Sequence, residues 1–266
     1  MSGIVSTHVK ISVLVPAYNE EELIRALLDS VKESFAELGR GDYEIIVCDN
    51  NSNDATAERA RKGGARVVFE SHNQIARARN AAAAVARGKW LIFIDADSRL
   101  TCELLRRTLE NLDSGRICGG GVRVRMDGGR QPWPIRFGLW LWNTASVRLK
   151  VAAGAYVYCL YEAWSESGGF DERYYAGEEI AFSRRLKRWG RLRGLRFAVI
   201  TDCELPTSPR KAEQFTLFQM MAQVLLCCIP GSLRRRERCG FWYRRPAGGG
   251  SGRASEPREQ KERGSS

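Results

Sequence analysis

Two aspartates separated by a single residue stand at the end of a strongly apolar run. Asp95 and Asp97 close the stretch KWLIFIDAD at residues 89–97, with Ala96 between them. Side chains at i and i+2 of an extended chain point to the same side, so the two carboxylates repel each other unless a positive charge lies nearby. Mg²⁺ and Mn²⁺ prefer oxygen ligands such as carboxylates and phosphates. The pair predicts a divalent-metal site that would join the protein to a diphosphate. Alternatively, Asp95 ends the strand and Asp97 caps the next helix.

Polar residues also end two earlier apolar runs. Tyr18 ends the run at residues 11–18, and Asp49 with Asn50 ends the run at residues 43–50. Apolar residues recur at helical intervals between the predicted strands, over residues 20–38, 54–62 and 74–88. Strands that alternate with helices predict an α/β fold with a mostly parallel sheet flanked by helices, and such sheets bind ligands beyond the carboxyl ends of their strands. An Asx turn is the alternative for Asp49 and Asn50.

Two helix boundaries have local signals. Asn19 and Glu22 have the spacing of a capping pair, which predicts that the first helix begins at Glu20. Gly88 is predicted to be the C-terminal cap of the helix over residues 74–88.

Four stretches together resemble glycosyltransferase family 2, whose members have the Rossmann-like GT-A fold. They are VLVPAYNEE, IIVCDNNSNDAT, ARARNAAAAVARGKWLIFIDADS and SGGFDERYYAGEEIAFSRRLKRWG, in the family's order, over roughly residues 9–211. The resemblance implies that Asp95 and Asp97 bind Mg²⁺ or Mn²⁺ and the diphosphate of a sugar nucleotide. It further implies donor-binding roles for Pro16, Ala17, Tyr18, Glu20, Asp49, Asn50, Arg77, Arg79, Asn80, Asp95 and Ala96.

One position departs from the family's pattern, since many relatives have a second aspartate where this chain has Asn50. An amide still accepts a hydrogen bond from a pyrimidine N–H but adds no charge, so the base is left open, with a UDP-sugar favoured. Taken singly, Arg77 and Arg79 also fit a solvated helix face, and Tyr18 fits an ordinary half-buried ring.

Glu178 and Glu179 follow a glycine-rich stretch and stand at the start of a predicted helix. Inverting sugar transfer needs a general base that takes the proton from the acceptor hydroxyl, and a helix N-terminus is a rigid platform for such a carboxylate. The family often has Glu-Asp here, with the second residue as the base. The resemblance therefore implies that Glu179 is the base, with Glu178 beside it. Alternatively, the two residues only complement the helix dipole.

An aromatic stretch precedes this acceptor half. Residues 130–150 predict a loop that leads into an apolar helix. Trp140 and Trp142 are interpreted as core residues, with sugar or lipid contact as the alternative.

The C-terminal part is predicted to contain three pieces with different roles. Arg210 is a candidate for neutralising the donor diphosphate at the end of a transferase domain over residues 1–213. Residues 214–233 carry no charge and are followed by arginines. This pattern predicts an amphipathic, interfacial helix over residues 214–235 that contacts anionic lipid. A membrane span and core packing are the alternatives. Residues 236–266 are polar, rich in Gly, Ser and Arg, and predicted to be disordered.

Composition bounds the classes of function. The 266 residues are 44% hydrophobic with net charge +11, which suits one globular domain and anionic partners. The eight cysteines have no CxxC spacing and the first ten residues lack a signal-peptide pattern, so we expect free thiols in a cytoplasmic protein, peripheral at the inner face of the cell membrane.

The leading hypothesis is a metal-dependent, inverting glycosyltransferase that uses a nucleoside-diphosphate sugar and a hydroxyl acceptor, either a glycan or a lipid-linked molecule. A nucleotidyltransferase would need a glycine-rich phosphate loop after the first strand, and residues 11–38 contain no glycine. A non-catalytic nucleotide-sugar binder of the same fold is a further alternative. Nucleic acid is not an expected partner, because no aromatic and basic RNA motif is present.

Overall fold

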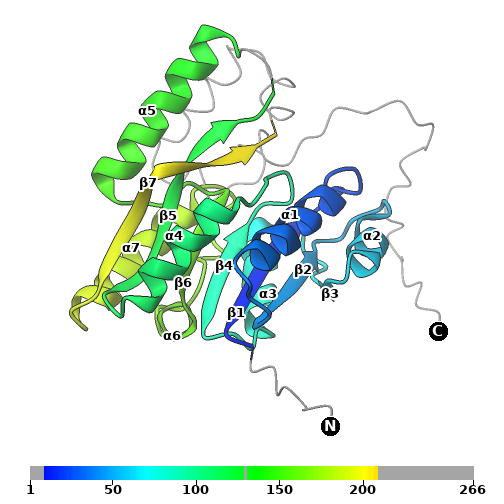
Figure 1. The fold of residues 1–266 in the computed structure, drawn as a ribbon, viewed down its shortest axis with the longest axis horizontal. Coiled ribbons are helices and arrows are strands. Elements are labelled where there is room, and N and C mark those ends of the chain that lie inside the picture. The colour runs from blue at the N-terminus through cyan, green and yellow to red at the C-terminus, as the bar shows by residue number, and fades with distance from the viewer. Residues whose placement is uncertain (1–8, 129–130, 209–266) are drawn as a thin grey trace, which may run out of the picture.

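The computed structural model describes residues 9–128 and 131–208, which form a seven-stranded sheet with helices on both faces (Figure 1). Arg210 and the segments 214–235 and 236–266 lie outside the described residues. The elements in chain order are β1 (Ile11–Ala17), α1 (Ile24–Glu37), β2 (Tyr43–Asp49), α2 (Thr56–Lys62), β3 (Arg66–Phe69), α3 (Ile75–Ala84), β4 (Trp90–Ile94), α4 (Cys102–Asp113), β5 (Ile117–Met126), α5 (Trp133–Leu149), β6 (Tyr156–Leu160), α6 (Tyr161–Glu166), α7 (Glu178–Arg191) and β7 (Arg196–Thr207).

The strand order is β3-β2-β1-β4-β6-β5-β7. The strands β3, β2, β1 and β4 run parallel to one another, β6 runs antiparallel to both β4 and β5, and β5 pairs in parallel with β7. The predicted α/β fold with a mostly parallel sheet is therefore confirmed. The antiparallel strand β6 therefore separates β3, β2, β1 and β4 from β5 and β7.

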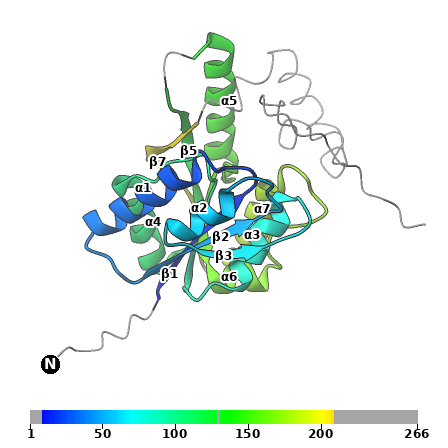
Figure 2. The same ribbon diagram turned by 90° about the vertical axis from the view of Figure 1, so that its right-hand side faces the viewer.

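Each face of the sheet has its own apolar core because the central strands are buried on both sides. One core joins alternate residues of β1 and β4 to α1, α4 and part of α5. The other joins the intervening residues to α3, α6 and α7. In Figure 2, α3 and α6 lie on the side of the sheet opposite α1 and α4. The two cores make the sheet a rigid support for whatever its strand ends carry.

The sheet opens between β1 and β4 at their carboxyl ends. Pairing of β1 with β4 stops at Leu14 and Phe93, whereas pairing of β1 with β2 continues to Ala17 and Asp49. Pro16 lies beyond the last residue pair of β1 with β4. Its lack of an N–H group therefore costs no hydrogen bond between these two strands. This split is the position at which open α/β sheets bind ligands.

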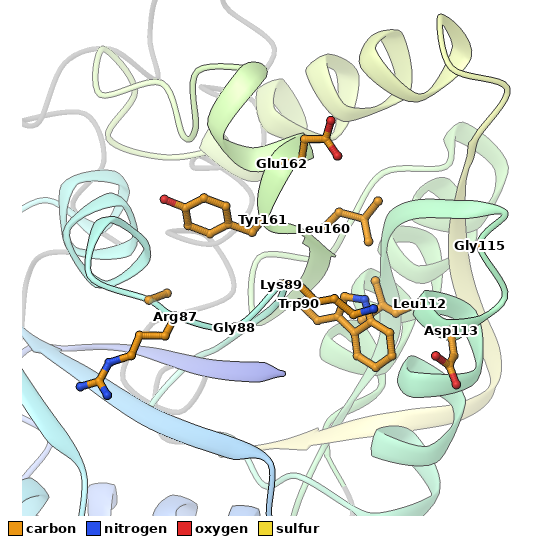
Figure 3. A pocket seen from close by; sticks show the side chains of 11 residues that line it. Arg87, Gly88, Lys89, Trp90, Leu112, Asp113, Gly115, Leu160, Tyr161 and Glu162 are labelled. Carbon is orange, nitrogen blue, oxygen red and sulfur yellow. The ribbon is translucent and has the colours of Figure 1, made fainter. Parts of the chain in front are cut away.

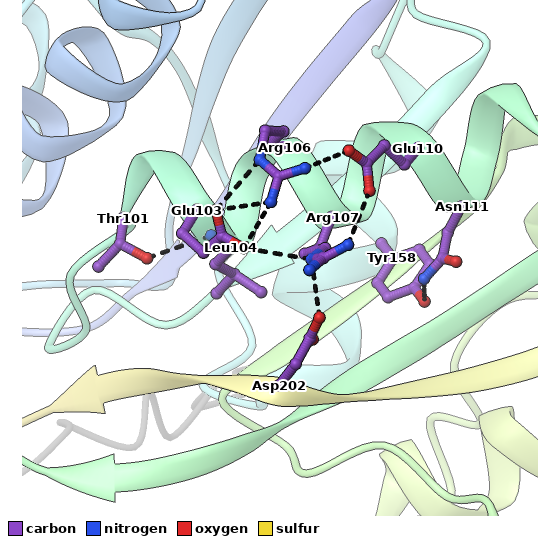
Figure 4. A network of polar contacts seen from close by, with 9 residues as sticks. All are labelled: Thr101, Glu103, Leu104, Arg106, Arg107, Glu110, Asn111, Tyr158 and Asp202. Atoms are coloured by element: carbon purple, nitrogen blue, oxygen red, sulfur yellow. Dashed lines mark hydrogen bonds and ion pairs between the residues drawn. The ribbon is translucent and has the colours of Figure 1, made fainter.

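Polar contacts of α4 tie it to strands β6 and β7 (Figure 4). Arg107 forms an ion pair of 2.7 Å with Asp202 of β7. Asn111 donates to the Tyr158 hydroxyl at 2.8 Å, and that hydroxyl donates to the Ala198 carbonyl at 3.0 Å. One helix thus braces strands β6 and β7, which are not neighbours in the sheet.

Two predicted helix boundaries are wrong. The first helix begins at Ile24 rather than Glu20, because Asn19 has φ 51° and its Oδ1 accepts from the Asn53 amide instead of capping a helix. The third helix ends at Ala84, so Gly88 is not its cap. A Cβ on Gly88 would lie 2.6 Å from the Ser12 nitrogen, so the glycine allows the chain to pass close to β1.

None of the helices in the described part of the chain is both long and apolar enough to cross a bilayer. The predicted interfacial segment 214–235 and its membrane-span alternative are not tested by this finding, since they fall outside that part.

Candidate active site

Three strands bring polar residues to one edge of the sheet. Asp49 is the last residue of β2 and lies opposite Ala17 of β1, and Asp95 follows directly on β4. The Asn50 amide donates to the Ala17 carbonyl at 2.8 Å, which continues the β1–β2 ladder past the strand ends. The predicted gathering of these residues at the carboxyl edge is therefore what the topology produces.

Arg79 of α3 connects the two halves of this edge. Its side chain is 1% exposed and donates to Asp95 Oδ1 at 2.9 Å and to Glu178 Oε1 at 2.7 Å. A further bond of 2.5 Å runs to the Gly154 carbonyl. The positive charge expected beside the aspartates is supplied, for Asp95, by a buried arginine. Arg79 thereby joins the turn formed by Asp95, Ala96 and Asp97, named the DxD turn here, to the first turn of α7.

Glu178 and Glu179 are held at the start of α7 by a left-handed residue, Gly177, at φ 73°. Both glutamates are buried, and Glu179 Oε1 lies against Gly154, 3.5 Å from where a Cβ on that glycine would be. Gly154 therefore contacts both Arg79 and Glu179. Sequence reasoning missed this residue, because only the tertiary fold brings it to the site.

The charges in this cluster are unbalanced, because one guanidinium serves three carboxylates. Burial, and then the charge of Glu178, raise the pKa of Glu179 to about 8, while Arg79 acts in the opposite direction. Burial also raises the pKa of Glu178, and its contact with Arg79 partly offsets that rise. Burial opposes the charge of Arg79, yet the three carboxylates outweigh it and raise its pKa. A carboxyl group with a pKa near neutrality can accept and release a proton during a reaction.

Asp97 lies where the end of β7 returns to the DxD turn. Its carbonyl accepts from the Ser208 amide at 2.9 Å, and its side chain is largely buried. It does not cap α4, whose N-cap is Thr101 with a bond to the Leu104 amide. The capping alternative for Asp97 is therefore wrong.

A divalent ion fits this turn only together with a ligand. In residues 9–128 and 131–208, no three His, Cys, Asp or Glu side chains are arranged to hold a metal. Asp95 also shares its carboxylate with Arg79. Mg²⁺ and Mn²⁺ commonly take one or two protein carboxylates and complete their shell with phosphate oxygens and water. The pair Asp95 and Asp97 fits that mode of binding.

Asn50 follows β2 directly and bonds to the turn before α3. Its Nδ2 donates to the carbonyls of Glu70 and His72, and its Oδ1 accepts from the Gln74 amide. These bonds hold the turn that leads from β3 into α3. The structure thus gives Asn50 a part in holding this turn, and its contact with the base stays a prediction.

Arg77 and Asn80 point to the loop before α7. Arg77 pairs with Glu172 at 3.3 Å, and Asn80 exchanges bonds of 2.9 Å with both backbone groups of Phe170. Of the three α3 residues predicted to line the donor pocket, only Arg79 reaches Asp95. The other two hold the loop that positions the glutamates.

The remaining predicted donor residues surround the ends of β1 and β2. Pro16 and Ala17 are buried in β1, and Tyr18 is half-buried after it. The Glu20 amide donates to Thr56 Oγ1 at 2.8 Å, which ties the loop after β1 to α2. Asp49 Oδ1 accepts from the Ser52 amide at 3.1 Å, as an Asx turn would. For Asp49, the turn and the predicted ligand contact are compatible, since a carboxylate has further acceptor sites.

A separate cavity of about 570 Å³ lies at the opposite edge of the sheet (Figure 3). Lys89 and Trp90 at the amino end of β4 line it together with Tyr161. Because β4 carries Asp95 at its other end, this cavity is not part of the candidate active site.

Comparisons with known proteins agree with this geometry. The sequence model described as "Glycosyl transferase family 2" matches residues 12–164, more than half of the 266-residue chain. An uncharacterized glycosyltransferase of Mycobacterium tuberculosis is 32% identical over 128 residues, which cover 48% of this chain and 55% of that protein. The undecaprenyl-phosphate 4-deoxy-4-formamido-L-arabinose transferase of Pseudomonas aeruginosa is 33% identical over 134 residues, covering 47% and 39%. The chain thus spans about half the length, or less, of these curated relatives.

Among solved structures, a mannosyltransferase from Pyrobaculum calidifontis in complex with GDP-Man and Mn²⁺ superimposes with a TM-score of 0.63. It is 21% identical and covers 82% of this chain and 62% of its own. This likeness confirms the predicted GT-A fold. The family match ends at residue 164, so it does not include Glu178 and Glu179.

Proposed function

The chain belongs to glycosyl transferase family 2, and from that premise we propose that it moves a sugar from a nucleoside-diphosphate sugar to a hydroxyl acceptor with inversion. The observation that carries the proposal is the buried Arg79, which bonds Asp95 and Glu178 at once and so brings the DxD turn beside the helix start that holds Glu179. A donor held at the strand ends would therefore lie beside a carboxylate able to take a proton.

In this proposal Asp97 and Asp95 would hold Mg²⁺ or Mn²⁺. The ion would neutralise charge on the departing diphosphate. The Pyrobaculum mannosyltransferase was crystallised with Mn²⁺, which supports the same use here. Arg210, which lies outside the described residues, is proposed as an additional positive charge near that diphosphate.

Glu179 is the proposed general base. The acceptor hydroxyl would give its proton to Glu179 as its oxygen attacks the anomeric carbon, and the sugar–diphosphate bond would break on the opposite face. Burial at a helix start holds this carboxylate in one orientation, and its raised pKa favours proton uptake. Glu178 is bonded to Arg79 and is proposed to position the cluster rather than to accept the proton.

A UDP-sugar is the proposed donor, with Asp49 and Tyr18 beside the nucleotide. A GDP-sugar is the main alternative donor, because the Pyrobaculum enzyme was crystallised with GDP-Man and because the side-chain amide of Asn50 is bonded to the 70–74 turn. The proposed acceptor is a glycan or lipid-linked hydroxyl compound, and the Pseudomonas relative, named for undecaprenyl phosphate, supports the lipid-linked choice.

Thermal unfolding with UDP-, GDP-, dTDP- and CDP-sugars, with and without Mn²⁺, tests the proposal. A ligand that binds only the folded chain raises the midpoint by mass action. A shift for one nucleotide that requires Mn²⁺ is expected. If no nucleotide sugar shifts the midpoint under either condition, the donor assignment is wrong.

The Asp97→Asn variant is expected to bind nucleoside diphosphate about 10- to 100-fold more weakly in the presence of Mn²⁺, because the amide lacks the charge that holds the ion. Calorimetric titration with UDP and Mn²⁺ measures this. The exposed Asp113→Asn variant, at the opposite edge of the sheet, is the matched control and should bind like the wild type. Equal affinity in both variants would remove Asp97 from the metal site.

Transfer is expected to accelerate as the pH rises through about 8, because Glu179 must lose its proton before it can act as a base. The same shift affects stability. The folded pKa lies above the ordinary value of 4.5, so this group's contribution is fully present below pH 4.5 and is lost as the pH rises through about 8. Initial rates and urea unfolding across that range measure both effects, and Glu179→Gln should flatten the stability profile. A rate independent of pH across this window would contradict the assignment.

A further inference from the structure

Helix α5 exposes an unusual concentration of large apolar side chains. It projects from the rest of the described chain in both ribbon views (Figures 1 and 2). Seven large hydrophobic side chains are exposed in the described residues, and five of them belong to α5. These five are Trp133, Phe137, Trp140, Leu141 and Leu149, with exposed fractions from 53% to 75%.

Four of these five side chains, together with the exposed Arg136, form one face. Trp133, Arg136, Phe137, Trp140 and Leu141 have the spacing i, i+3, i+4, i+7 and i+8, which places them along a single stripe of a helix. We name this stripe the outer face of α5. The rings of Phe137 and Trp140 stack on it with centroids 5.7 Å apart. The interpretation of Trp140 as a core residue is therefore wrong, because it is 58% exposed.

The opposite face already holds α5 to the domain. Leu139 and Trp142 pack against the core on that side of the sheet. Asn143 exchanges two bonds with the Val124 backbone, at 3.0 and 2.9 Å. The outer face is thus not part of this packing, and a cluster of exposed aromatic side chains on one stripe is typical of an interaction surface.

The charged side chains of α5 and of its flanking residues are all positive. Residues 128–161 contain no aspartate or glutamate, while Arg136, Arg148 and Lys150 are exposed. Lys187 of α7 donates to the Leu149 carbonyl at 2.9 Å, and burial followed by the charges of Arg184 and Lys150 lowers its pKa. Aromatic and basic side chains without acidic ones match the headgroup region of an anionic bilayer.

The same charges disfavour two other occupants. A second copy of this chain, related by twofold symmetry, would bring Arg136 and its basic neighbours against themselves. The apolar segment 214–233 of the chain itself is followed by RRRER, which would add positive charge beside α5. An anionic lipid surface complements all of these groups.

The helix is also connected to the reacting groups. After α5, the Ala152 amide donates to Ser183 Oγ of α7 at 3.0 Å. Two residues later, the Gly154 carbonyl accepts a bond from Arg79, and Gly154 lies beside Glu179. The C-terminal end of α5 is therefore only a few residues along the chain from Gly154, which lies beside Glu179.

We propose that the outer face of α5 is a membrane-docking surface, whose aromatic side chains enter the headgroup region of an anionic bilayer and bring the site to a lipid-linked acceptor. The identity of the acceptor rests on the proposed function, whereas the docking itself is measured without donor or catalysis.

Co-sedimentation of the full chain with phosphatidylcholine vesicles containing about one third phosphatidylglycerol tests this surface. The variant Trp133→Ser/Phe137→Ser/Trp140→Ser is expected to partition at least about tenfold more weakly than the wild type, because it loses the apolar area that would be buried. Phe69→Ser/Leu192→Ser is the matched control, since it removes exposed apolar side chains elsewhere and should bind like the wild type. Vesicles of phosphatidylcholine alone should bind the wild type more weakly.

Several results would overturn the proposal. One is absence of wild-type binding to anionic vesicles. Another is a triple variant that binds as well as the wild type, together with loss of binding when the chain is truncated before Gln214. That pair of results would assign the membrane contact to the C-terminal segment. A wild-type dimer that the triple variant converts to monomer in sedimentation velocity would identify a second copy as the occupant. An unfolding midpoint lowered in the triple variant but not in the control would mean that the chain covers its own α5. A donor-induced thermal shift remains measurable in every case, so failure of docking is distinguishable from failure of the proposed transfer.

Discussion

The Glu179→Gln variant should transfer sugar roughly 10² to 10⁴ times more slowly than the wild type, the usual contribution of a positioned general base. Glutamine keeps the size of the side chain and its place at the start of α7, but it cannot accept the acceptor's proton. Donor affinity should change little, because the proposed metal and nucleotide contacts come from β1, β2 and the DxD turn. Single-turnover transfer measures the chemical step, and calorimetry with donor and Mn²⁺ measures binding.

Glu178→Gln is the matched control one residue earlier. Glu178 accepts a bond of 2.7 Å from Arg79, so its replacement should weaken the hold on Arg79 and Asp95 and affect donor binding as well as turnover. The two variants should thus differ in kind: Glu179→Gln lowers kcat, and Glu178→Gln changes KM together with kcat. Near wild-type turnover of Glu179→Gln would rule it out as the base, and loss of donor binding in that variant would indicate a structural role.

Local patterns predict most of the sheet because its strands are buried on both faces and therefore read as continuous apolar runs. The runs at residues 11–18 and 43–50 match β1 and β2 to within one residue. The boundaries that failed were decided by contacts distant in sequence. Asn19 has the residue type and spacing of a helix cap, yet its Oδ1 accepts from the Asn53 amide. Because the two residues are far apart in the sequence, no local pattern predicts this bond.

The same limit applies to the candidate site. Strand topology explains why Asp49, Asp95 and Asp97 share an edge, so their gathering was predictable. The position of Asn50 was not, because its partners at residues 70–74 are set by the turn after β3. The link from Arg79 to Glu178 spans 99 residues, and nothing in a helix reading ARARNAAAA distinguishes Arg79 from Arg77.

The Arg79→Met variant should be destabilised by about 3 to 5 kcal/mol, the cost of removing one partner from a buried ion pair. Methionine fills similar space but leaves the carboxylates of Asp95 and Glu178 without their shared positive charge. For a domain of this size the unfolding midpoint should fall by roughly 6 to 20 °C. Urea unfolding of the wild type and the variant measures the free energy of unfolding directly.

Two companion variants separate charge from packing. Arg79→Lys keeps the charge but lacks the planar fork that serves Asp95, Glu178 and the Gly154 carbonyl together, so it should lie between the wild type and Arg79→Met. Adding Glu178→Gln to Arg79→Met removes one of the stranded charges and should recover part of the lost stability. The deficit of Arg79→Met should also shrink at low pH, where the stranded carboxylates are protonated and uncharged. If the double variant is no more stable than Arg79→Met, and the deficit does not change with pH, the loss comes from packing around Phe170, whose ring lies 5.2 Å from the guanidinium, and not from unpaired charge.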